Sequence, residues 1–535
     1  MRLRTPLVAL GSAALALGLL SNGATPAATG TAGPAASAAA EPVLDTYLRD
    51  TWKSFTAMVD PGTGLVSDNV GGDLAGATRA GYTSPTNIGA YLWSTTVAKD
   101  TGLIGRKESR ARINQTLDTL ARLEIHEPSG MFYNWYDPAT GAKLTAWPEL
   151  NSQGGHDRVY PFLSSVDNGW LATGLMVVAR SDKKVAAKAN AIRSQMDFGF
   201  YYDENAGAKL TDDQPVGGQI SGGFWLEPNP QTQTCNTPVS FRAGSAPVYQ
   251  TCHRYGAFNT EPRMASYLGI AAGQIPAKHY WGPIRTFYND NCDYSWTETK
   301  PVGSWKSYDG IPVFEGALPY RDINVVPTWG GSMFEALMVP LFVPEEKWGP
   351  QSWGVNHPLY VRGQIEHGLE EADYGYWGFS PSNNPDGGYR EYGVDQLGME
   401  PNGYASDEPR TFVDQPYGDC PGRAGSPAPT DYNNGVVTPH ASFLAYRYAP
   451  EAALDNLAKL RADFDAYGPG GFYDAINVGT KVVSKRYLSL DQGMIMAALG
   501  NALAGDDMRR YVSKGAMQDR LQPMMRQEVF AAGVR

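Results

Sequence analysis

The chain has 535 residues and a formal net charge of −11 at pH 7, and aromatic side chains make up 11% of it, with 13 Trp and 30 Tyr. Proteins that bind nucleic acid or anionic lipid carry clustered Lys and Arg, so this balance counts against both kinds of partner. Aromatic rings can stack on sugar faces, although plain core packing is the commoner reason for their presence. The composition therefore favours a neutral or cationic ligand, with sugars among the candidates.

The first 40 residues have the features of a processed leader. Residues 1–24, MRLRTPLVALGSAALALGLLSNGA, place two Arg before an apolar run and then small residues, which is the pattern of a secretory signal. A stretch rich in Ala, Gly, Pro and Thr follows and is too poor in large side chains to build a core. No second apolar run reaches the roughly 18 residues of a membrane span. We therefore predict a secreted protein, with a signal and leader over residues 1–40 and one domain over residues 41–535.

Apolar residues recur at helical spacing in about a dozen segments along the rest of the chain. These segments are 43–59, 87–100, 112–125, 164–181, 186–199, 261–273, 330–343, 357–372, 440–448, 451–466 and 489–503, followed by a last amphipathic run. Loops rich in Gly, Pro and aromatic residues separate them, as at 130–144, 376–393 and 467–475. Paired helices with large loops at one end predict an all-α fold, the (α/α)6 barrel, with a generic helical bundle as the alternative.

Four cysteines are present: Cys235, Cys252, Cys292 and Cys420. In an exported chain without CxxC or HxxxH spacing, two disulfides are expected rather than a metal site. Three pairings are possible, and the short loop between Cys235 and Cys252 favours that pair, with the other two closing a long loop. We expect no metal and no cofactor.

The chemistry of this chain has to come from carboxylates, because motifs for a nucleophilic serine, a phosphate loop, a dinucleotide or zinc are absent from the sequence. Acids stand at the starts of several apolar segments. Paired carboxylates cleave glycosidic bonds: one protonates the leaving oxygen, and the other attacks the sugar or activates water.

Glu261, in the stretch YGAFNTEPRMASYLGIAAG, is the first of these acids. A first-turn charge, with Asn259 or Thr260 as the cap, would explain it, because the helix dipole favours an acid there. On a helical projection, however, Glu261 falls on the apolar stripe, whereas Arg263 projects elsewhere. Local rules leave the two roles equally open, and a proton donor would need desolvation to outweigh the dipole.

Four further acids occupy similar places. Glu335 interrupts the apolar segment 330–343, where a hydrogen bond to a neighbouring loop would explain it. Asp474 follows an aromatic loop, and Asp167 and Asp491 open apolar helices that they could simply cap. Together the five acids predict a site at one mouth of the fold.

Several long motifs in the same order give the chain a resemblance to a known family. They are TGLVSDN, SSVDNGWLATGL, PTWGGSMFEALMVPLF, RGQIEHG, YGYWGFSPS, GVVTPHASFLAYRYAPEAALDNL, YGPGGFYDA and YLSLDQGMIMAALGNAL. These motifs resemble the glycoamylase-like domain of bacterial β-1,2-glucanases, in glycoside hydrolase families 144 and 162, and the cyclising domain of cyclic β-1,2-glucan synthases. The similarity runs over nearly all of residues 41–535.

The resemblance implies an (α/α)6 barrel that acts on β-glucosidic, β-1,2 bonds. The segment NTEPR resembles the part of the family that carries the general acid, which gives that role to Glu261. In the retaining, cyclising enzymes a glutamate nucleophile follows a WG-apolar-Ser sequence, and here that place is Pro381. The difference favours inversion, with the two carboxyls about 6.5–9.5 Å apart. The candidates for the base are Asp474 and then Asp491, with Glu335 as a supporting acid.

The resemblance also suggests residues that contact the sugar, although each of the aromatic and polar ones could equally serve in packing. They are Asp167, Trp329, Trp377, His440 and Tyr473. Two insertions, 383–434 and 222–252, exceed what the resemblance predicts and would reshape the cleft.

The predicted function is a secreted glycoside hydrolase acting on an oligo- or polysaccharide. Two alternatives stay open. A polysaccharide lyase on a similar helical toroid would need basic residues for uronic acids, which the acidic balance counts against. A glycan-binding protein that kept the fold and lost activity would not need the acids.

Overall fold

The structure is a computed structural model that describes residues 40–207, 213–230, 238–240, 246–288, 300–399 and 435–535. Residues 33–535 form one compact unit, and the predicted boundary at residue 41 stays a prediction. The helices are α1 Glu41–Met58, α2 Pro85–Asp100, α3 Arg106–Leu120, α4 Ser165–Ser181, α5 Lys183–Arg193, α6 Arg263–Ala272, α7 Met333–Leu337, α8 Glu345–Trp348, α9 Trp353–Glu366, α10 Pro439–Ala445, α11 Pro450–Asp463, α12 Ser489–Leu503, α13 Asp507–Val512 and α14 Ala516–Gln527.

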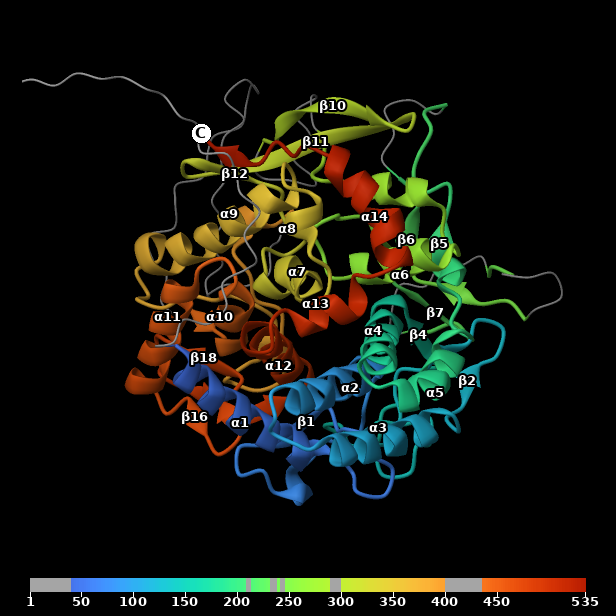
Figure 1. The fold of residues 1–535 in the computed structure, drawn as a ribbon, viewed down its shortest axis with the longest axis vertical. Coiled ribbons are helices and arrows are strands. Elements are labelled where there is room, and N and C mark those ends of the chain that lie inside the picture. Colours follow the sequence, from blue (N-terminus) through green and yellow to red (C-terminus); the bar gives the residue numbers. More distant parts are fainter. Residues whose placement is uncertain (1–39, 208–212, 231–237, 241–245, 289–299, 400–434) are drawn as a thin grey trace, which may run out of the picture. The chain divides into compact units, whose positions relative to one another are not determined.

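The helices contact one another in a regular order (Figure 1). Six of them follow one another through direct contacts or hydrogen bonds, in the order α6, α4, α2, α12, α10 and α7, and hydrogen bonds from Arg263 of α6 to carbonyls of α7 join the two ends of this series. A second helix lies against each of the six: α14 on α6, α5 on α4, α3 on α2, α1 on α12, α11 on α10 and α9 on α7. Each predicted helical segment therefore overlaps a helix of the structure, and each of the six central helices has one outer partner.

Glycines allow two of the central helices to approach closely. A Cβ atom on Gly89 of α2 would come within 2.5 Å of the carbonyl oxygen of Trp170 in α4, and one on Gly174 of α4 within 2.6 Å of the carbonyl oxygen of Gly89. Backbone contact at this distance leaves no room for a larger residue. The rings of Trp93, Trp170 and Phe342 fill the space beside this crossing.

Short antiparallel sheets accompany the helices, so the prediction of an all-α fold is correct only in part. The largest sheet has the order β10 Val302–Tyr308, β11 Ile311–Tyr320, β12 Ile323–Val325 and β21 Gly533–Val534. Three sheets have three strands: β4 Phe162–Ser164, β7 Gly223–Trp225 and β8 Tyr249–Gln250; β5 Tyr202–Asp203, β6 Gln219–Ser221 and β9 Arg254–Tyr255; β15 Val436–Val437, β18 Ala475–Asn477 and β19 Val483–Ser484. Four are pairs: β1 Asn69–Gly71 with β20 Arg486–Leu488, β2 Ile125–His126 with β3 Met131–Phe132, β13 Ser382–Asn383 with β14 Tyr389–Arg390, and β16 Tyr467–Gly468 with β17 Gly471–Phe472.

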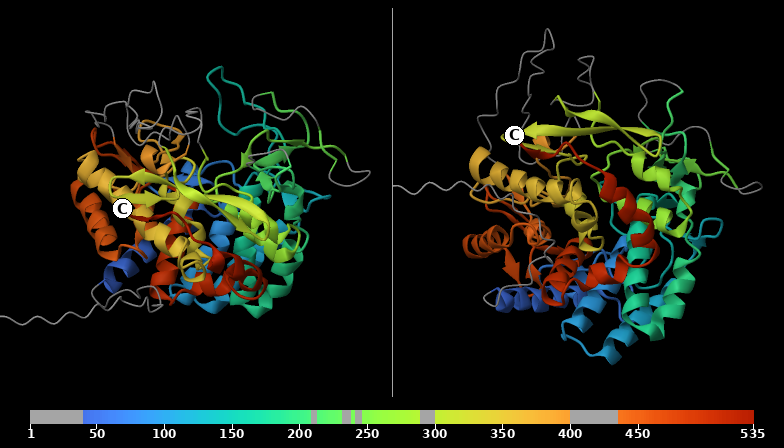
Figure 2. Two further views of the ribbon diagram at one scale, coloured as in Figure 1. Left: turned by 90° about the horizontal axis from the view of Figure 1, so that it is seen from above. Right: turned by 45° about the horizontal axis from the view of Figure 1, so that its top comes forward.

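Most of these strands lie where the sequence predicts loops, because two or three residues of extended chain on each side of a turn leave no period to detect. The pair β10–β11 is longer, with register from Val302 opposite Ala317 to Tyr308 opposite Ile311. Both views in Figure 2 show this pair, drawn in yellow-green, side by side and close to the C-terminal strand, which pairs with β12. Pairing between segments far apart in the chain cannot be predicted from local patterns.

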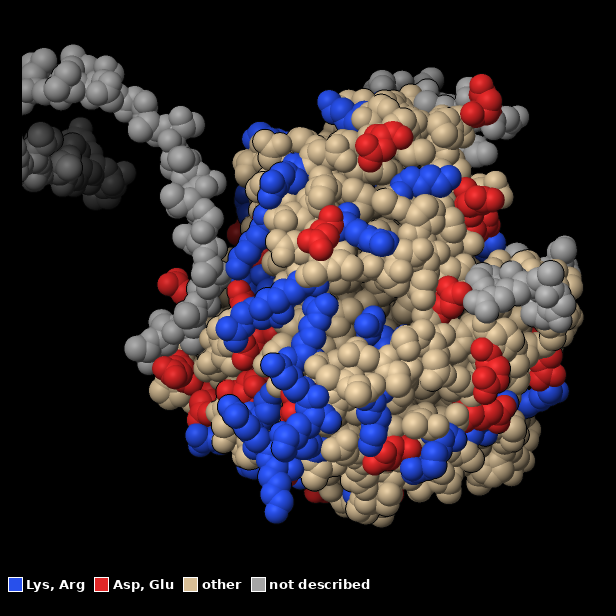
Figure 3. All heavy atoms as spheres, turned by 45° about the vertical axis from the view of Figure 1, so that its right-hand side comes forward, with Lys and Arg blue, Asp and Glu red and all other residues tan. Residues whose placement is uncertain are grey.

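Three of the four cysteines, Cys235, Cys292 and Cys420, lie outside the described residues, so the predicted disulfides stay a prediction. Cys252 is described and exposed. Within the described residues, no helix combines the length and apolar character needed to cross a bilayer. The face drawn in Figure 3 carries side chains of both signs, with Lys and Arg gathered over one part of it and Asp and Glu among them.

Candidate active site

A cavity of about 460 Å³ opens at the ends of several central helices. Its lining combines aromatic and acidic side chains from distant parts of the sequence: Asp68, Tyr82, Trp135, Trp147, Asp167, Trp170, Phe334 and Tyr389 are among them. A concave site with many apolar surfaces and a few converging polar groups is typical of small-molecule and sugar binding.

Three aromatic rings form one wall of the cavity. The ring of Tyr82 packs edge-on against Trp135, at 5.4 Å between centroids, and against Trp147, at 5.3 Å. The ring centroids of Trp135 and Trp147 are 5.5 Å apart. All three side chains are partly buried, so each keeps some surface on which a sugar ring could stack.

Two carboxylates stand beside this aromatic wall. Asp167, in the first turn of α4, accepts a hydrogen bond of 2.7 Å from the hydroxyl of Thr86. Asp68 accepts from the amides of Asn87, at 2.9 Å, and Asn69, at 3.0 Å. Burial and then the charge of Asp167 raise the pKa of Asp68, while these amide donors act in the opposite direction. Both side chains are partly buried and face the cavity.

Glu261 lies in the turn that leads into α6. The helix begins at Arg263, with Pro262 as its N-cap residue, so Glu261 precedes the helix, and the alternative of a first-turn charge does not apply. It is partly buried. Burial and then the nearby Glu335 carboxyl raise the pKa of Glu261 to about 8, although its own backbone N–H and Arg263 lower it. Burial and the Glu335 charge thus outweigh the donors that lower the pKa of Glu261, a direction that favours the protonated form at neutral pH.

Glu335 caps its own helix and also faces Glu261. Its Oε2 accepts hydrogen bonds from the N–H of Gly330 (3.0 Å) and from the Ser332 hydroxyl (2.9 Å), while the Ser332 hydroxyl accepts from the Glu335 N–H. This capping box explains the acid in an apolar helix, and the motif Ser-x-x-Glu could have predicted it. Burial raises the pKa of Glu335, whereas these donors lower it.

Asp474 and Asp491 form a second acidic group. Each is 2% exposed. The Asp474 Oδ2 accepts from the N–H of Asn383 at 2.6 Å. Burial and then the charge and hydrogen bond of Asp491 raise the pKa of Asp474 well above its usual range. The pKa of Asp491 is raised to about 7, mainly by burial, while its hydrogen bond with Asp474 lowers it. The simple capping role weighed for Asp491 is excluded, because α12 has no side-chain cap.

His440, predicted to contact the sugar, contacts this second group instead. Its Nδ1 lies 3.3 Å from Asp491 Oδ2 and 2.8 Å from the hydroxyl of Thr438. At 1% exposure it has no surface for a ligand. Burial lowers the pKa of His440 to about 4, so the imidazole is neutral beside the two acids.

Tyr389 lies near carboxyls of both acidic groups. It lies on β14 of the pair β13–β14, is 53% exposed, and lines the cavity. Loss of solvation around its hydroxyl, followed by the charges of Asp491, Asp474, Glu391 and Glu261, raises its pKa. Carboxyls of both groups therefore lie near this one tyrosine of the cavity lining.

The structure removes two of the predicted aromatic contacts. Trp377 is 1% exposed in the core. Its backbone N–H donates a hydrogen bond to the side chain of Asn456, and its carbonyl accepts one from that side chain. Tyr473 is 8% exposed and packs on Tyr487. Neither ring can stack on a sugar. Trp329 is partly buried and precedes Gly330, whose N–H binds Glu335, so it remains beside the acids.

The comparisons agree with the resemblance read from the sequence. Residues 298–509 match a family model described as "Putative glucoamylase", and residues 46–214 match one described as "Protein of unknown function (DUF3131)". A curated relative is the cyclic β-(1,2)-glucan synthase NdvB of Rhizobium meliloti, 23% identical over 569 residues, or 86% of this chain and 18% of the relative. The chain thus spans less than a fifth of that protein's length.

Solved structures share the fold. The endo-β-1,2-glucanase of Chitinophaga pinensis, in complex with sophorotriose and glucose, is 17% identical with a TM-score of 0.57 over 90% of this chain and 97% of that one. The β-1,2-glucanase of Parabacteroides distasonis is 15% identical with a TM-score of 0.59, over 91% and 60%. The chain is therefore a helix-rich protein that carries a glucoamylase-type domain over residues 298–509 and resembles cyclic β-1,2-glucan synthase and the β-1,2-glucanases in sequence pattern and fold.

Proposed function

We propose that this protein is a secreted, inverting glycoside hydrolase that cleaves a β-glucan, with β-1,2-linked glucan as the first substrate to test. The observation that carries the proposal is a cavity lined by aromatic side chains, by Asp68 and Asp167, and by Phe334 and Leu490, the chain neighbours of Glu335 and Asp491. The pKa of Glu261 is raised to about 8 by burial and then by the Glu335 charge, which favours the protonated form at neutral pH. A general acid needs that protonation state at the working pH. The names of the similar solved structures, β-1,2-glucanases, support the choice of linkage.

The fold that we propose for the helices is the (α/α)6 barrel. Its support is the series α6, α4, α2, α12, α10 and α7, each with one outer partner. In this arrangement the turns before α6 and β18, which carry Glu261 and Asp474, and the first turns of α7 and α12, which carry Glu335 and Asp491, belong to one mouth.

In the proposed reaction, Glu261 gives its proton to the glycosidic oxygen as the bond to the anomeric carbon breaks. A water molecule attacks that carbon from the opposite face, and a carboxylate takes the proton of the water. Asp491 fits this second role better than Asp474. With a pKa of about 7 it is largely ionised slightly above neutral pH, whereas Asp474 keeps its proton and donates a hydrogen bond to it. Asn383 and Leu490, the neighbours of this pair, line the cavity and mark the path of the water.

Sugar binding is assigned to the exposed parts of the cleft. Trp135, Trp147 and Tyr82 offer ring surfaces, and Asp68 and Asp167 offer acceptors for sugar hydroxyls. The insertion beginning at Asn383 supplies Tyr389, so the choice of glycan depends partly on a segment that exceeds the family pattern.

The test is hydrolysis of a panel of β-1,2-, β-1,3- and mixed-linkage glucans by the purified mature chain, with products followed by NMR. We expect shorter β-1,2-glucans whose new reducing ends first appear as the α-anomer. A product that absorbs as an unsaturated sugar would identify a lyase, and measurable binding without any product would identify a glycan-binding protein. New reducing ends that first appear as the β-anomer would overturn the inverting mechanism but not the proposal of a glycoside hydrolase.

A further inference from the structure

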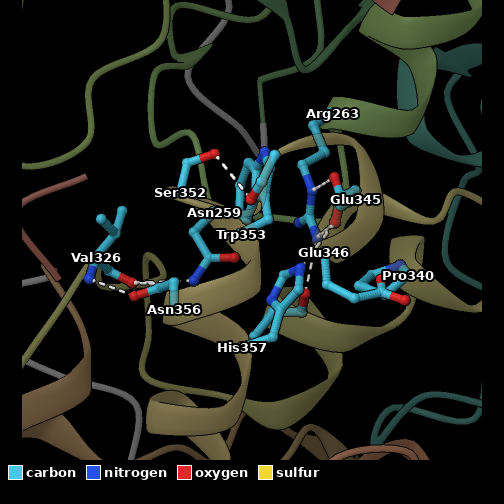
Figure 4. Close-up of polar contacts among 12 residues, drawn as sticks. Asn259, Arg263, Val326, Pro340, Glu345, Glu346, Ser352, Trp353, Asn356 and His357 are labelled. Atoms are coloured by element: carbon cyan, nitrogen blue, oxygen red, sulfur yellow. Dashed lines mark hydrogen bonds and ion pairs between the residues drawn. The ribbon is translucent and has the colours of Figure 1, made fainter. Parts of the chain in front are cut away.

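Arg263 is the first residue of α6 and stands two residues after Glu261. Its side chain is 2% exposed and that of Glu345, at the start of α8, is fully buried. Arg263 Nε donates to Glu345 Oε1 at 2.9 Å and Nη2 donates to Oε2 at 3.0 Å. Figure 4 shows the guanidinium directed at this carboxylate. Two parallel bonds of this kind fix the orientation of both groups.

Further partners keep Glu345 ionised. The hydroxyl of Tyr267 donates to Oε1 at 2.9 Å. Nε2 of His357 lies 3.1 Å from Oε2, as Figure 4 shows. Burial by itself would raise the pKa of Glu345, but the charge of Arg263 and the hydrogen bonds of His357 and Arg263 lower it to about 2. Burial lowers the pKa of His357, while the hydrogen bond and charge of Glu345 act in the opposite direction. The Arg263–Glu345 pair is therefore neutral as a whole.

The remaining donors of Arg263 bind the backbone on both sides of the site. Nη1 donates to the carbonyl of Thr260, at 2.8 Å, and to that of Glu335, at 2.9 Å. Nη2 donates to the carbonyl of Ala336 at 2.7 Å. Thr260 directly precedes Glu261, so one guanidinium bridges the two segments that carry the facing acids.

We propose that Arg263 is a positioning residue for this site: its guanidinium, neutralised by Glu345, holds the segment that carries Glu261 against the segment that carries Glu335. The inference rests on the proposed role of Glu261. It assigns a task to a buried ion pair that lies outside the cavity.

The arrangement has a consequence for the proton on Glu261. Held close, the Glu335 carboxyl adds to burial in raising the pKa of Glu261, while the Arg263 charge lowers it and Glu345 offsets that charge. Other groups that face Glu261 belong to different elements and are left unchanged by substitutions at Arg263 or Glu345. They are the charged Glu391 and the phenols of Tyr255 and Tyr389.

Two variants test the arrangement, one through the position of the two acids and the other through the charge of Arg263. Arg263→Lys keeps a cation but cannot bind three carbonyls and a carboxylate together, so the two acids are no longer held in place. Glu345→Gln keeps the shape and leaves the Arg263 charge without compensation. In both, the pKa of Glu261 should fall by about 1–3 pH units, the usual effect of a nearby opposite charge or a lost like charge.

The experiment is a carbon-13 NMR titration of Glu-labelled protein, with Glu261→Gln used to assign the signal. A second readout is the alkaline limb of kcat/KM, which should move to lower pH with the titration. Both variants leave buried groups unpaired and could unfold. If they unfold, Tyr267→Phe replaces them, since it removes one hydrogen bond from Glu345 and keeps the ion pair. In this variant the pKa of Glu261 should also fall, but by less.

The matched control is Glu346→Gln. Glu346 is the next residue of α8 and pairs with the buried Arg509, with Oε2 3.2 Å from Nη2. Its loss should cost comparable stability, but neither partner is among the groups that shift Glu261. The titration of Glu261 should stay where it is in the wild type.

Two results would overturn the inference: a wild-type Glu261 that titrates near the ordinary value for glutamate, or folded Arg263 and Glu345 variants in which its titration does not move relative to Glu346→Gln. The titration needs no turnover. If it behaves as expected while no glucan is cleaved, the proposed function fails and the positioning role stands.

Discussion

The two acidic groups of the cleft are built differently, although each joins two carboxyls. Glu261 and Glu335 face each other without a shared hydrogen bond among those described, and Glu335 is satisfied by its own helix cap. Asp474 and Asp491 interact directly, with the neutral His440 beside them. In the first group burial raises the pKa of both acids and the Glu335 charge adds to that of Glu261, whereas in the second the two acids interact with each other through a hydrogen bond.

This difference separates the two roles that glycoside cleavage requires. A proton donor is favoured where burial and a neighbouring carboxyl outweigh the donors that stabilise its charge, which is the case of Glu261. A base is favoured where a protonated neighbour stabilises the ionised form, which is the case of Asp491 beside Asp474. Two acids with the same chemistry thus acquire opposite tasks from their surroundings.

The largest expected effect is that of Glu261→Gln, which removes the proton donor. We expect kcat on β-1,2-glucan to fall by about 10²–10⁴-fold, the usual contribution of general acid catalysis, measured as release of reducing ends. Glucan binding should persist in affinity electrophoresis. Turnover within about tenfold of the wild type would contradict the role.

The same variant has a second, independent signature in stability. The folded-state pKa of Glu261 is raised to about 8, so the stability that this group contributes is complete at acid pH and is lost as the pH rises through about 8. Glutamine does not ionise. At pH near 9 the variant should therefore unfold at a higher temperature than the wild type, as measured by calorimetry, whereas a lower unfolding temperature there would argue against a buried, protonated Glu261.

The second prediction decides between the two aspartates. Asp491→Asn removes the ionised group and should lower kcat by about 10²-fold or more. Asp474→Asn should cost less, since an amide can still donate the hydrogen bond of a protonated acid. The kcat values of the two variants are compared with each other, and circular dichroism checks that both variants are folded. The opposite order of losses would make Asp474 the base, as first predicted from the sequence.

The third prediction concerns pH. Activity requires Glu261 protonated and the aspartate pair ionised, so kcat/KM should fall as the pH rises through about 8 and also as it falls through about 7. Beyond each limb the rate should change about tenfold per pH unit. The aspartate limb belongs to the pair rather than to one residue. A plateau that extends to pH 5 would show that a different acid or base controls the rate.

The smallest effect is expected at the aromatic wall. Trp135→Ala removes a ring surface, and a stacking contact worth about 1–1.5 kcal/mol corresponds to a roughly tenfold rise in KM with little change in kcat. Trp305→Ala, on β10, is the matched control, because Trp305 does not line this cavity. Equal KM values for the two variants would exclude the proposed stacking surface.

Much of the fold could be predicted from the sequence, because helical periodicity is local. The segments 43–59, 87–100 and 489–503 correspond to α1, α2 and α12. The segment 330–343 is less regular: α7 ends at Leu337, and Pro340 follows in a 3-10 turn. The short strands were not predictable, since their partners lie far away in the chain, as with Asn69 opposite Leu488.

The candidate site was predictable in part. The sequence pointed to the five acids, and the quoted motif TGLVSDN contains Asp68 without any signal that it would face the cavity. Trp135 and Trp147 were indistinguishable from Trp377 in sequence, since all stand in loops rich in turn residues. Only burial separates them: Trp377 is 1% exposed, and the other two line the cavity.

By itself the sequence determined the helical segments, the acids at their starts and the family resemblance, since all three depend on residues close together in the chain. The tertiary structure decided which acids meet, and therefore their protonation. Arg263 and Glu345 are 82 residues apart, and so no local pattern relates them, yet their contact lies beside the acid proposed to donate the proton. Proton affinity depends on burial and on neighbouring charges, and both are properties of the folded chain.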